Sequence, residues 1–293
     1  MSSIHKSVLL NEVIKFLNPE PNQNFIDCTF GAGGHSREIL KRIAPSGKLL
    51  AIDADIGTRN QISEIRDNGN LIFINDNFRN LDSIAKEKFP YTVNGILMDL
   101  GLSSDQLEAS GRGFTFQKDE PLDMRFDISK ATKAADILNF GSLDYLINIF
   151  KNYGEIRGAE NLAKKIITAR KEKKFQTTFD LVAMVGKSGI KSRSPRINSA
   201  TFVFQALRIA VNDELNALRN VLPAAFKILA PGGRLVVISF HALEDKIVKN
   251  IFRDWHKNKV VKLLTKKPIA PSFAEVRQNP RSRSAKMRVI EKL

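Results

Sequence analysis

The stretch FIDCTFGAGGHS at residues 25–36 decides the fold, because a short apolar run ends there in a carboxylate and a glycine-rich turn. Helical periodicity follows at once, since Ile39, Leu40 and Ile43 fall on one side of a helix. A glycine-rich turn between a first strand and a first helix lets the backbone approach a ligand closely at the carboxyl edge of a parallel sheet. The stretch therefore predicts a ligand-binding α/β fold.

Further apolar runs bounded by turn residues have the character of buried strands. The first three are KLLAID (48–53), LIFIND (71–76) and NGILMDLG (94–101). Strands and helices alternating at this spacing are typical of a parallel sheet covered on both faces. Strand character returns only in GGRLVVISFH (232–241), after a break at APGG, and MRVI (287–290) is a candidate last strand.

The alternation of strands and helices stops in the middle of the chain. SLDYLINIFKNYG, GAENLAKKIITAR and TTFDLVAMVG carry apolar residues at helical spacing, and no comparable strand accompanies them. The simplest account is a helical domain inserted into an α/β domain. We therefore expect an α/β domain formed by residues 1–106 and 209–293, interrupted by a helical domain at residues 107–208.

The chain is strongly basic, with 46 Lys and Arg against 31 Asp and Glu, a formal charge of +15 and a pI near 9.9. This excess favours a polyanionic partner, above all nucleic acid, through phosphate neutralisation and counterion release. A cation-rich surface kept for solubility is the alternative.

The compartment follows from cysteine use and from the apolar runs. A single cysteine, Cys28, argues against a disulfide framework and a cysteine-rich metal site, and we expect no metal. Asn11, Glu12 and Lys15 interrupt the N-terminal apolar run, and no stretch reaches the roughly 18 apolar residues of a membrane span. We therefore expect a cytoplasmic protein without a membrane segment.

The glycine loop suits two ligands, NAD and S-adenosylmethionine. Gly31 and Gly33 begin a GxGxxG match in which Ser36 replaces the third glycine. Asp53 ends the second strand about 20 residues further on, where an acid can hold a ribose hydroxyl. Asp27 separates the ligands, because a pyrophosphate beside it would cost about 4 kcal/mol at ~4 Å and an effective dielectric near 20. The cationic groups of S-adenosylmethionine reverse that sign, and a turn-capping Asp27 is the alternative.

Two more strand ends complete the predicted site. The third strand ends at Asp76, and Phe78 follows with a ring that could cover an adenine. Asp99, at the end of the fourth strand, would face the reactive end of the cofactor. The lone pair of a nucleobase amine is delocalised into the ring, so a carboxylate here could orient the N–H bonds for methyl transfer. Binding of cofactor alone is the alternative role, because the two prolines and aromatic that often follow this acid in DNA amino methyltransferases are absent.

Long sequence blocks carry a resemblance that extends over essentially the whole chain. In order they are HKSVLLNEV, DCTFGAGGHS, ILMDLGLSSDQL, RGFTF, PLDMR, NYGE, FQALRIAVNDEL, LAPGGRLVVISFHALEDKIVK and NPRSRSAKMR. With these blocks the chain resembles the bacterial methyltransferases, called MraW, that modify N4 of a cytosine in the decoding region of 16S ribosomal RNA. The resemblance implies a Rossmann-like class I S-adenosylmethionine-dependent methyltransferase fold with an inserted helical domain for RNA recognition. It also implies S-adenosylmethionine as cofactor and 16S ribosomal RNA as partner, within the small subunit or a late assembly particle.

The same resemblance implies individual cofactor contacts. In that family the glycine loop and its histidine contact the cofactor, and so do acids, an aromatic and a glutamine along the following strand ends. Carried over to this sequence, the contacts are Gly33, Gly34, His35, Asp53, Phe78, Asp99 and Gln106. Taken alone, His35 would more often be a helix-capping or packed histidine.

One segment departs from the family pattern. Where the family shows His-Pro ahead of Ala-Thr-Arg-Thr-Phe-Gln, this chain has NSATFVFQ, which begins at Asn198 and Ser199. If that loop touches RNA, its contacts differ or are lost. Basic residues nearby could supply compensating phosphate contacts, namely Lys187, Lys191, Arg193 and Arg196.

Several assignments stay open at the level of sequence. His241 and Asp245 are candidates for the group that takes the amine proton, and equally for a hydrogen-bonded pair at the sheet edge. A flexible basic tail around Arg281 and Arg283 would suit a folded ribosomal surface. A methyltransferase acting on another base or on protein, and a binding-only ribosome assembly factor, are the alternative functions. The oligomeric state is undetermined.

Overall fold

In this computed structural model, which describes residues 6–58, 62, 65, 69–102, 106–107, 110–190 and 198–293, the chain forms two compact units. Unit 1 combines Met1–Gly101 with Leu215–Leu293, and unit 2 is Leu102–Glu214. Unit 2 is therefore an insertion in the sequence of unit 1, and its bounds lie within a few residues of the interruption expected at 107–208. The cofactor-binding and RNA-recognition roles of the two parts stay predictions.

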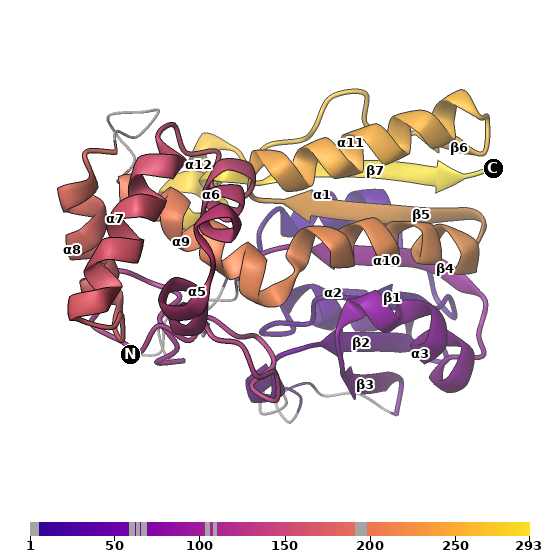
Figure 1. Cartoon of the computed structure of the whole chain (residues 1–293). Coiled ribbons are helices and arrows are strands. Elements are labelled where there is room, and N and C mark those ends of the chain that lie inside the picture. The colour runs from indigo at the N-terminus through magenta and orange to yellow at the C-terminus, as the bar shows by residue number, and fades with distance from the viewer. Residues whose placement is uncertain are drawn as a thin grey trace. The chain divides into compact units, whose positions relative to one another are not determined.

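Unit 1 is built on a seven-stranded sheet with the order β3-β2-β1-β4-β5-β7-β6 (Figure 1). The strands are β1 Phe25–Asp27, β2 Leu49–Asp53, β3 Leu71–Asn75, β4 Val93–Asp99, β5 Leu229–Ser239, β6 Val261–Leu263 and β7 Lys286–Lys292. The strands from β3 to β5 are parallel, whereas β7 runs antiparallel to both of its neighbours. This order with an antiparallel seventh strand is that of class I S-adenosylmethionine-dependent methyltransferases, and it confirms the predicted fold class.

Helices cover both faces of this sheet. Helices α1 (Leu10–Leu17) and α2 (Gly34–Ile43) contribute to one core, and α3 (Leu81–Lys88), α10 (Glu214–Ile228) and α11 (Ala242–Lys257) contribute to the other. Side chains along each strand alternate between the two cores, as the period of a strand requires. On β2, for example, Leu50 and Ile52 join the second core, whereas Leu49 and Ala51 join the first.

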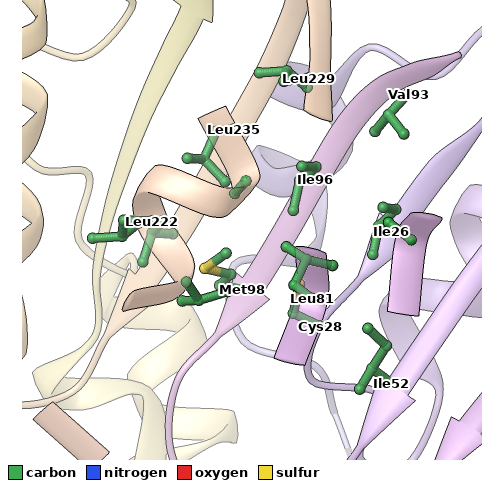
Figure 2. Close-up of a cluster of buried hydrophobic side chains, with 14 of the residues drawn as sticks. Ile26, Cys28, Ile52, Leu81, Val93, Ile96, Met98, Leu222, Leu229 and Leu235 are labelled. Atoms are coloured by element: carbon green, nitrogen blue, oxygen red, sulfur yellow. The ribbon is translucent and has the colours of Figure 1, made fainter. Parts of the chain in front are cut away.

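The core on the α3 and α10 face holds the strands firmly. Ile26, Ile52 and Ile96 from three strands belong to one buried cluster with Leu81 of α3 and Leu222 of α10 (Figure 2). Burial of a side chain of this size stabilises the fold by about 1.5–3 kcal/mol. The strand ends, where the predicted ligand contacts lie, are therefore carried by a well-packed frame.

The predicted break at APGG is instead an irregularity within β5. This strand begins at Leu229, and its register against β4 shifts between the pairs Val93–Leu229 and Gly95–Arg234. Gly232 takes up the extra residues with a φ of 74°, a left-handed conformation that glycine adopts readily.

Unit 2 is predominantly helical. Its helices are α5 Ala134–Phe140, α6 Leu143–Asn152, α7 Ala159–Glu172, α8 Thr178–Ser188 and α9 Ser199–Asn212. The hydroxyl of Ser142 caps α6 by accepting the N–H of Tyr145 at 3.2 Å. Within the ranges that the structure describes, no helix is long and apolar enough to cross a membrane.

The basic segment predicted to be a flexible tail is folded. Arg281 and Arg283 lie in the 3₁₀ helix η3 (Pro280–Ser284), between the short helix α12 (Phe273–Gln278) and β7. Ser282 is fully buried, and its hydroxyl donates to the carbonyl of Asn279 at 2.8 Å. The prediction was wrong because it was based on the arginine content of the segment, whereas small polar residues such as Ser282 hold the segment in place through hydrogen bonds.

Candidate cofactor and active site

The acidic strand ends lie around β1, where the sheet continues to β2 on one side and to β4 on the other. β1 lies between β2 and β4, and Asp27 is in register with Ala51 on β2 and Leu97 on β4. Asp53 and Asp99 end β2 and β4, so both lie at the same edge as Asp27. In open parallel sheets this edge is where ligands bind.

Asp27 is buried under the glycine loop and organises it. Its side chain has no exposed surface, and it accepts hydrogen bonds from Ser36 Oγ at 2.7 Å and from the N–H of Thr29 at 3.1 Å. Burial raises the pKa of this carboxyl above its ordinary value of 3.8, while the bond from Ser36 and the nearby His35 lower it. The geometry supports the turn-capping role for Asp27, because Thr29 and Ser36 donate to its two carboxylate oxygens.

The glycines of the loop meet close neighbours. Gly33 caps α2 with a φ of 74°, and a Cβ there would lie 2.9 Å from Ile65 and from the ring of Phe30. A Cβ on Gly34 would overlap the hydroxyl of Ser7. These positions therefore need glycine, and they leave the first backbone N–H groups of α2 at the sheet edge, where a helix N-terminus favours an anion.

Asp53 is half-buried, and its carboxylate can accept further hydrogen bonds. Its Oδ2 accepts the N–H of Gly31 at 2.8 Å, and its Oδ1 accepts the N–H of Asp55 at 2.9 Å. A carboxylate has about four acceptor positions, so about two remain for a ligand. Burial raises the pKa of Asp53 from 3.8 to about 7, although the two backbone hydrogen bonds lower it.

His35 is buried beside the partly buried Asp99, and three polar atoms of the two side chains lack hydrogen-bond partners among the described residues. His35 lies in the first turn of α2 with 5% of its surface exposed, and its Nε2 is 3.4 Å from Asp99 Oδ2. Both ring nitrogens of His35 and Oδ1 of Asp99 are buried without a hydrogen-bond partner among the described residues. A buried polar group left unpaired costs about 1–3 kcal/mol. Such a pair fits a site in which a bound molecule completes the hydrogen bonding.

Phe78 is held at the end of β3 by the turn around Asp76. The Asp76 carboxylate accepts the N–H of Asn77 at 2.6 Å and the side-chain amide of Asn80 at 2.9 Å. Phe78 opens the following 3₁₀ helix η2 (Phe78–Asn80), and its partly buried ring packs against the core on the α3 face. One part of the ring thus rests on the protein and the remainder is accessible to a ligand.

The structure brings Gly33, Gly34, His35, Asp53, Phe78 and Asp99 together in unit 1 at one edge of the sheet. Gln106 belongs to unit 2, where its carbonyl accepts the hydroxyl of Ser110 at 2.6 Å and 8% of its surface is exposed. Its contact with the cofactor stays a prediction. Ser103 and Ser104, next to it in the predicted block, lie outside the described residues.

The departure from the family pattern falls at the start of α9. Asn198 caps this helix by accepting the N–H of Ala200 at 2.9 Å, and the hydroxyl of Ser199 donates to the carbonyl of Ile190 at 3.0 Å. Both side chains are thus engaged in helix initiation. The basic residues proposed to compensate include Lys191, Arg193 and Arg196, which lie outside the described residues.

His241 and Asp245 do not form a pair with each other. His241 Nδ1 accepts the N–H of Glu244 at 3.4 Å, and its Nε2 lies 3.1 Å from Glu244 Oε1. Asp245 accepts two hydrogen bonds from the guanidinium of Arg288, at 2.7 and 3.2 Å. Each side chain is thus engaged by its own partner, so the geometry favours structural roles at the start of α11 for both residues.

Sequence reasoning missed the side chains that support the loop. Ser36 could have been found, because it lies in the first turn of the helix that follows Asp27. Ser7 could not, since no spacing rule links it to Gly34, and the two residues meet only through the folded chain.

Comparison with known proteins agrees with this architecture. A model of the MraW methylase family matches residues 2–293. The ribosomal RNA small subunit methyltransferase H of Thermomicrobium roseum is 45% identical over 100% of this chain and 95% of its own length, and that of Dictyoglomus thermophilum is 46% identical over 100% and 98%. The crystal structure of an rRNA methylase from Streptococcus thermophilus covers 100% of this chain and 99% of its own, at 11% identity and a TM-score of 0.46, a likeness too distant to add to the assignment. With a family model and close relatives that span it from end to end, the chain belongs to the MraW methylase family.

Proposed function

We propose that this chain transfers a methyl group from S-adenosylmethionine to the exocyclic N4 amine of a cytosine in the decoding region of 16S ribosomal RNA. The observation that carries the proposal is the match of the entire chain to the MraW methylase family, together with relatives at 45% and 46% identity that are named small subunit ribosomal RNA methyltransferases. The glycine loop and acidic strand ends at the switch point of the sheet suit that cofactor.

Different residues of unit 1 would bind different parts of the cofactor. Asp53 would accept the two ribose hydroxyls, and Phe78 would cover the adenine ring. The N-terminus of α2, with Gly34 and His35, would receive the methionine carboxylate. Gln106 of unit 2 completes the set that the family implies. When bound, the cofactor supplies a methyl group on a positively charged sulfur, which explains acidic rather than basic side chains at the strand ends.

Asp99 would act on the substrate amine. Its Oδ1 is buried and has no partner among the described residues, so it can accept an N–H of the cytosine amine. Such a hydrogen bond fixes the amine and favours localisation of the nitrogen lone pair toward the methyl group. His35 Nε2 lies 3.4 Å from the other oxygen of the same carboxylate.

The substrate would be the RNA within the small ribosomal subunit or a late assembly particle, and the cytoplasm would be the compartment. The helices of unit 2 would contribute to RNA recognition, as the inserted domain of the family does. Within unit 2, 18 Lys and Arg stand against 14 Asp and Glu, so this contribution would depend more on shape than on charge.

Transfer of label from the cofactor tests the proposal. The protein is incubated with methyl-labelled S-adenosylmethionine and either naked 16S ribosomal RNA, assembly particles at several stages, or complete small subunits, all lacking the modification. Label mapped to N4 of one cytosine is the expected result. Label on another base or on protein would support a different methyltransferase, and binding without label would support an assembly factor without turnover. Parallel titrations with S-adenosylhomocysteine and NAD should show binding of the first, and tight binding of NAD would contradict the proposed cofactor.

A further inference from the structure

The positive charge of this chain is concentrated in its C-terminal part. Residues 215–293 contain 17 Lys and Arg against 5 Asp and Glu, whereas residues 1–101 contain 11 against 12. Unit 2 has the modest excess given above. The net charge of +15 is therefore carried mainly by the C-terminal part of unit 1, the unit that contains the cofactor loop.

The most basic stretch lies at the same edge of the sheet as the cofactor loop. β7 lies beside β5 (Figure 1) and runs antiparallel to it, and its first residue, Lys286, is in register with Ser239, the last residue of β5. The chain immediately before β7 is therefore at the carboxyl edge of the parallel strands. That chain is α12 and η3, so both lie at the edge where Asp53 and Asp99 end their strands.

Helix α12 is fastened to the segment that supports the glycine loop. The segment is Lys6–Leu9. Glu275 Oε1 accepts the N–H of Leu9 at 2.8 Å, and the side-chain amide of Asn279 donates to the carbonyl of Lys6 at 3.1 Å. Ser7, inside the segment, lies against Gly34 at the start of α2. One short piece of chain therefore separates α12 from the loop that would hold the cofactor.

The exposed surface of α12 and η3 combines an exposed aromatic ring with positively charged side chains. Phe273 is 93% exposed, the highest value among the exposed large hydrophobic side chains of the described residues. Arg277 follows it by four positions, so the two side chains are neighbours on the helix surface, and Arg283 is exposed on η3. Lys266 and Lys267 are exposed shortly before α12. From residue 264 to 285 the only acidic residue is Glu275, whose carboxylate is engaged by the N-terminal segment.

We propose that Phe273, Arg277 and Arg283 form a docking surface for single-stranded RNA next to the target base. An unpaired base would stack on the ring of Phe273, while the two guanidinium groups contact the flanking phosphates. Stacking of this kind tolerates any base, so the surface would position the strand without reading its sequence. A protein partner is less suited, because the core of a protein interface is depleted in charge whereas this ring is surrounded by cations. The inference rests on the proposed RNA substrate and adds its path over unit 1.

Substitutions on this surface can be matched with controls at the opposite edge of the sheet. Phe273→Ala and Phe273→Leu remove the aromatic ring, Phe273→Trp retains stacking, and Arg277→Glu with Arg283→Glu reverses two charges. Tyr91→Ala removes an exposed aromatic just before β4, at the amino edge, and Lys86→Glu with Lys88→Glu makes an equal charge change at the end of α3. All these side chains are exposed, so thermal stability should be preserved.

The full-length variants are titrated with unmodified small subunits and with naked 16S ribosomal RNA at several salt concentrations, and methylation and S-adenosylhomocysteine affinity are measured in parallel. Phe273→Ala and Phe273→Leu should weaken RNA binding and raise the KM for RNA about ten-fold, and Phe273→Trp should restore both. The double arginine variant should reduce the salt slope of binding by about two. Cofactor affinity should stay within two-fold, and the control variants should bind RNA as the wild type does.

Unchanged RNA affinity and salt slope in the Phe273 and arginine variants would overturn the inference. So would loss of binding to subunits with full retention of binding to naked RNA, because that pattern assigns the surface to a ribosomal protein. A wild-type protein that binds RNA through this surface without methylating it would contradict the proposed function and leave the docking surface standing. The two failures are therefore distinguishable.

Discussion

Ionisation of Asp53 should control the affinity of unit 1 for the adenosine part of the cofactor. In the free protein, burial raises the pKa of this carboxyl to about 7. The ionised form accepts the N–H groups of Gly31 and Asp55 and retains about two acceptor positions for ribose hydroxyls. The protonated form turns one of these positions into a donor, which opposes a hydroxyl donor. We therefore expect the ionised protein to bind and the protonated protein to bind poorly.

The pKa of about 7 gives the size of the effect. Roughly one Asp53 in eleven is ionised at pH 6 and roughly ten in eleven at pH 8, so the apparent Kd should fall about ten-fold over this interval. A suitable probe is 5′-deoxy-5′-methylthioadenosine, which keeps the adenine and ribose and lacks the ionisable amino acid portion. Isothermal titration calorimetry across pH 6 to 8 then reports titration of the protein alone.

Asp53→Asn supplies the control, because it keeps the size of the side chain and cannot ionise. At pH 8 this variant should bind the probe more weakly by about 1–3 kcal/mol, through loss of a charged hydrogen bond. Its Kd should also be independent of pH. A wild-type Kd that stays constant from pH 6 to 8, or a pH slope that survives in Asp53→Asn, would refute the assignment of Asp53 to the ribose.

Three further outcomes follow from the same contacts. The raised pKa of Asp53 contributes to the stability of the folded protein. This contribution is fully present below pH 3.8 and is lost as the pH rises through about 7. Asp53→Asn should therefore gain stability relative to the wild type as the pH rises from 5 to 8 in urea unfolding, and a constant difference would contradict this. Gly34→Ala should destabilise by about 1–3 kcal/mol through overlap with Ser7, and Ser7→Ala in the same chain should recover most of the loss; additive effects in the double-mutant cycle would disprove the contact. Asp99→Asn should lower kcat for RNA methylation by about 10²-fold or more if its carboxylate orients the amine, with a much smaller change in S-adenosylhomocysteine affinity, and equal changes would restrict Asp99 to cofactor binding.

The parallel part of the fold is accessible from the sequence because its strands are buried on both faces. β1, β2 and β4 are largely apolar runs that end in an acid, and their short length and bounding turn residues identify them as strands. β6 is only three residues long and exists through its pairing with β7, a contact that no local pattern records. The glycines of APGG indicate a break in the strand, yet the pairing with β4 continues past them because Gly232 absorbs the shift.

The site divides in a similar way. Parallel strands share one carboxyl edge, so the sequence positions of Asp53 and Asp99 suffice to predict that both acids lie there. The burial of Asp27 depends on how α2 packs over the glycine loop and on the hydroxyl that Ser36 places beside the carboxylate. The sequence does not show how deeply this carboxylate is buried. The separate partners of His241 and Asp245 depend on Arg288, which reaches α11 from a strand more than forty residues later in the chain.

The two signs of charge at this edge of the sheet serve reactants of opposite charge. The methyl donor is cationic and the RNA is polyanionic, so a surface of one sign would repel one of them. Here the acids are buried or half-buried at the strand ends, where attraction is strong and little screened, whereas Arg277 and Arg283 are exposed, where attraction is screened over about 8–10 Å. Salt should consequently separate the two binding events. Between 50 and 200 mM salt, we expect RNA affinity to fall steeply while S-adenosylmethionine affinity changes little, and a parallel fall in both titrations would show that the acids do not bind the donor from a protected position.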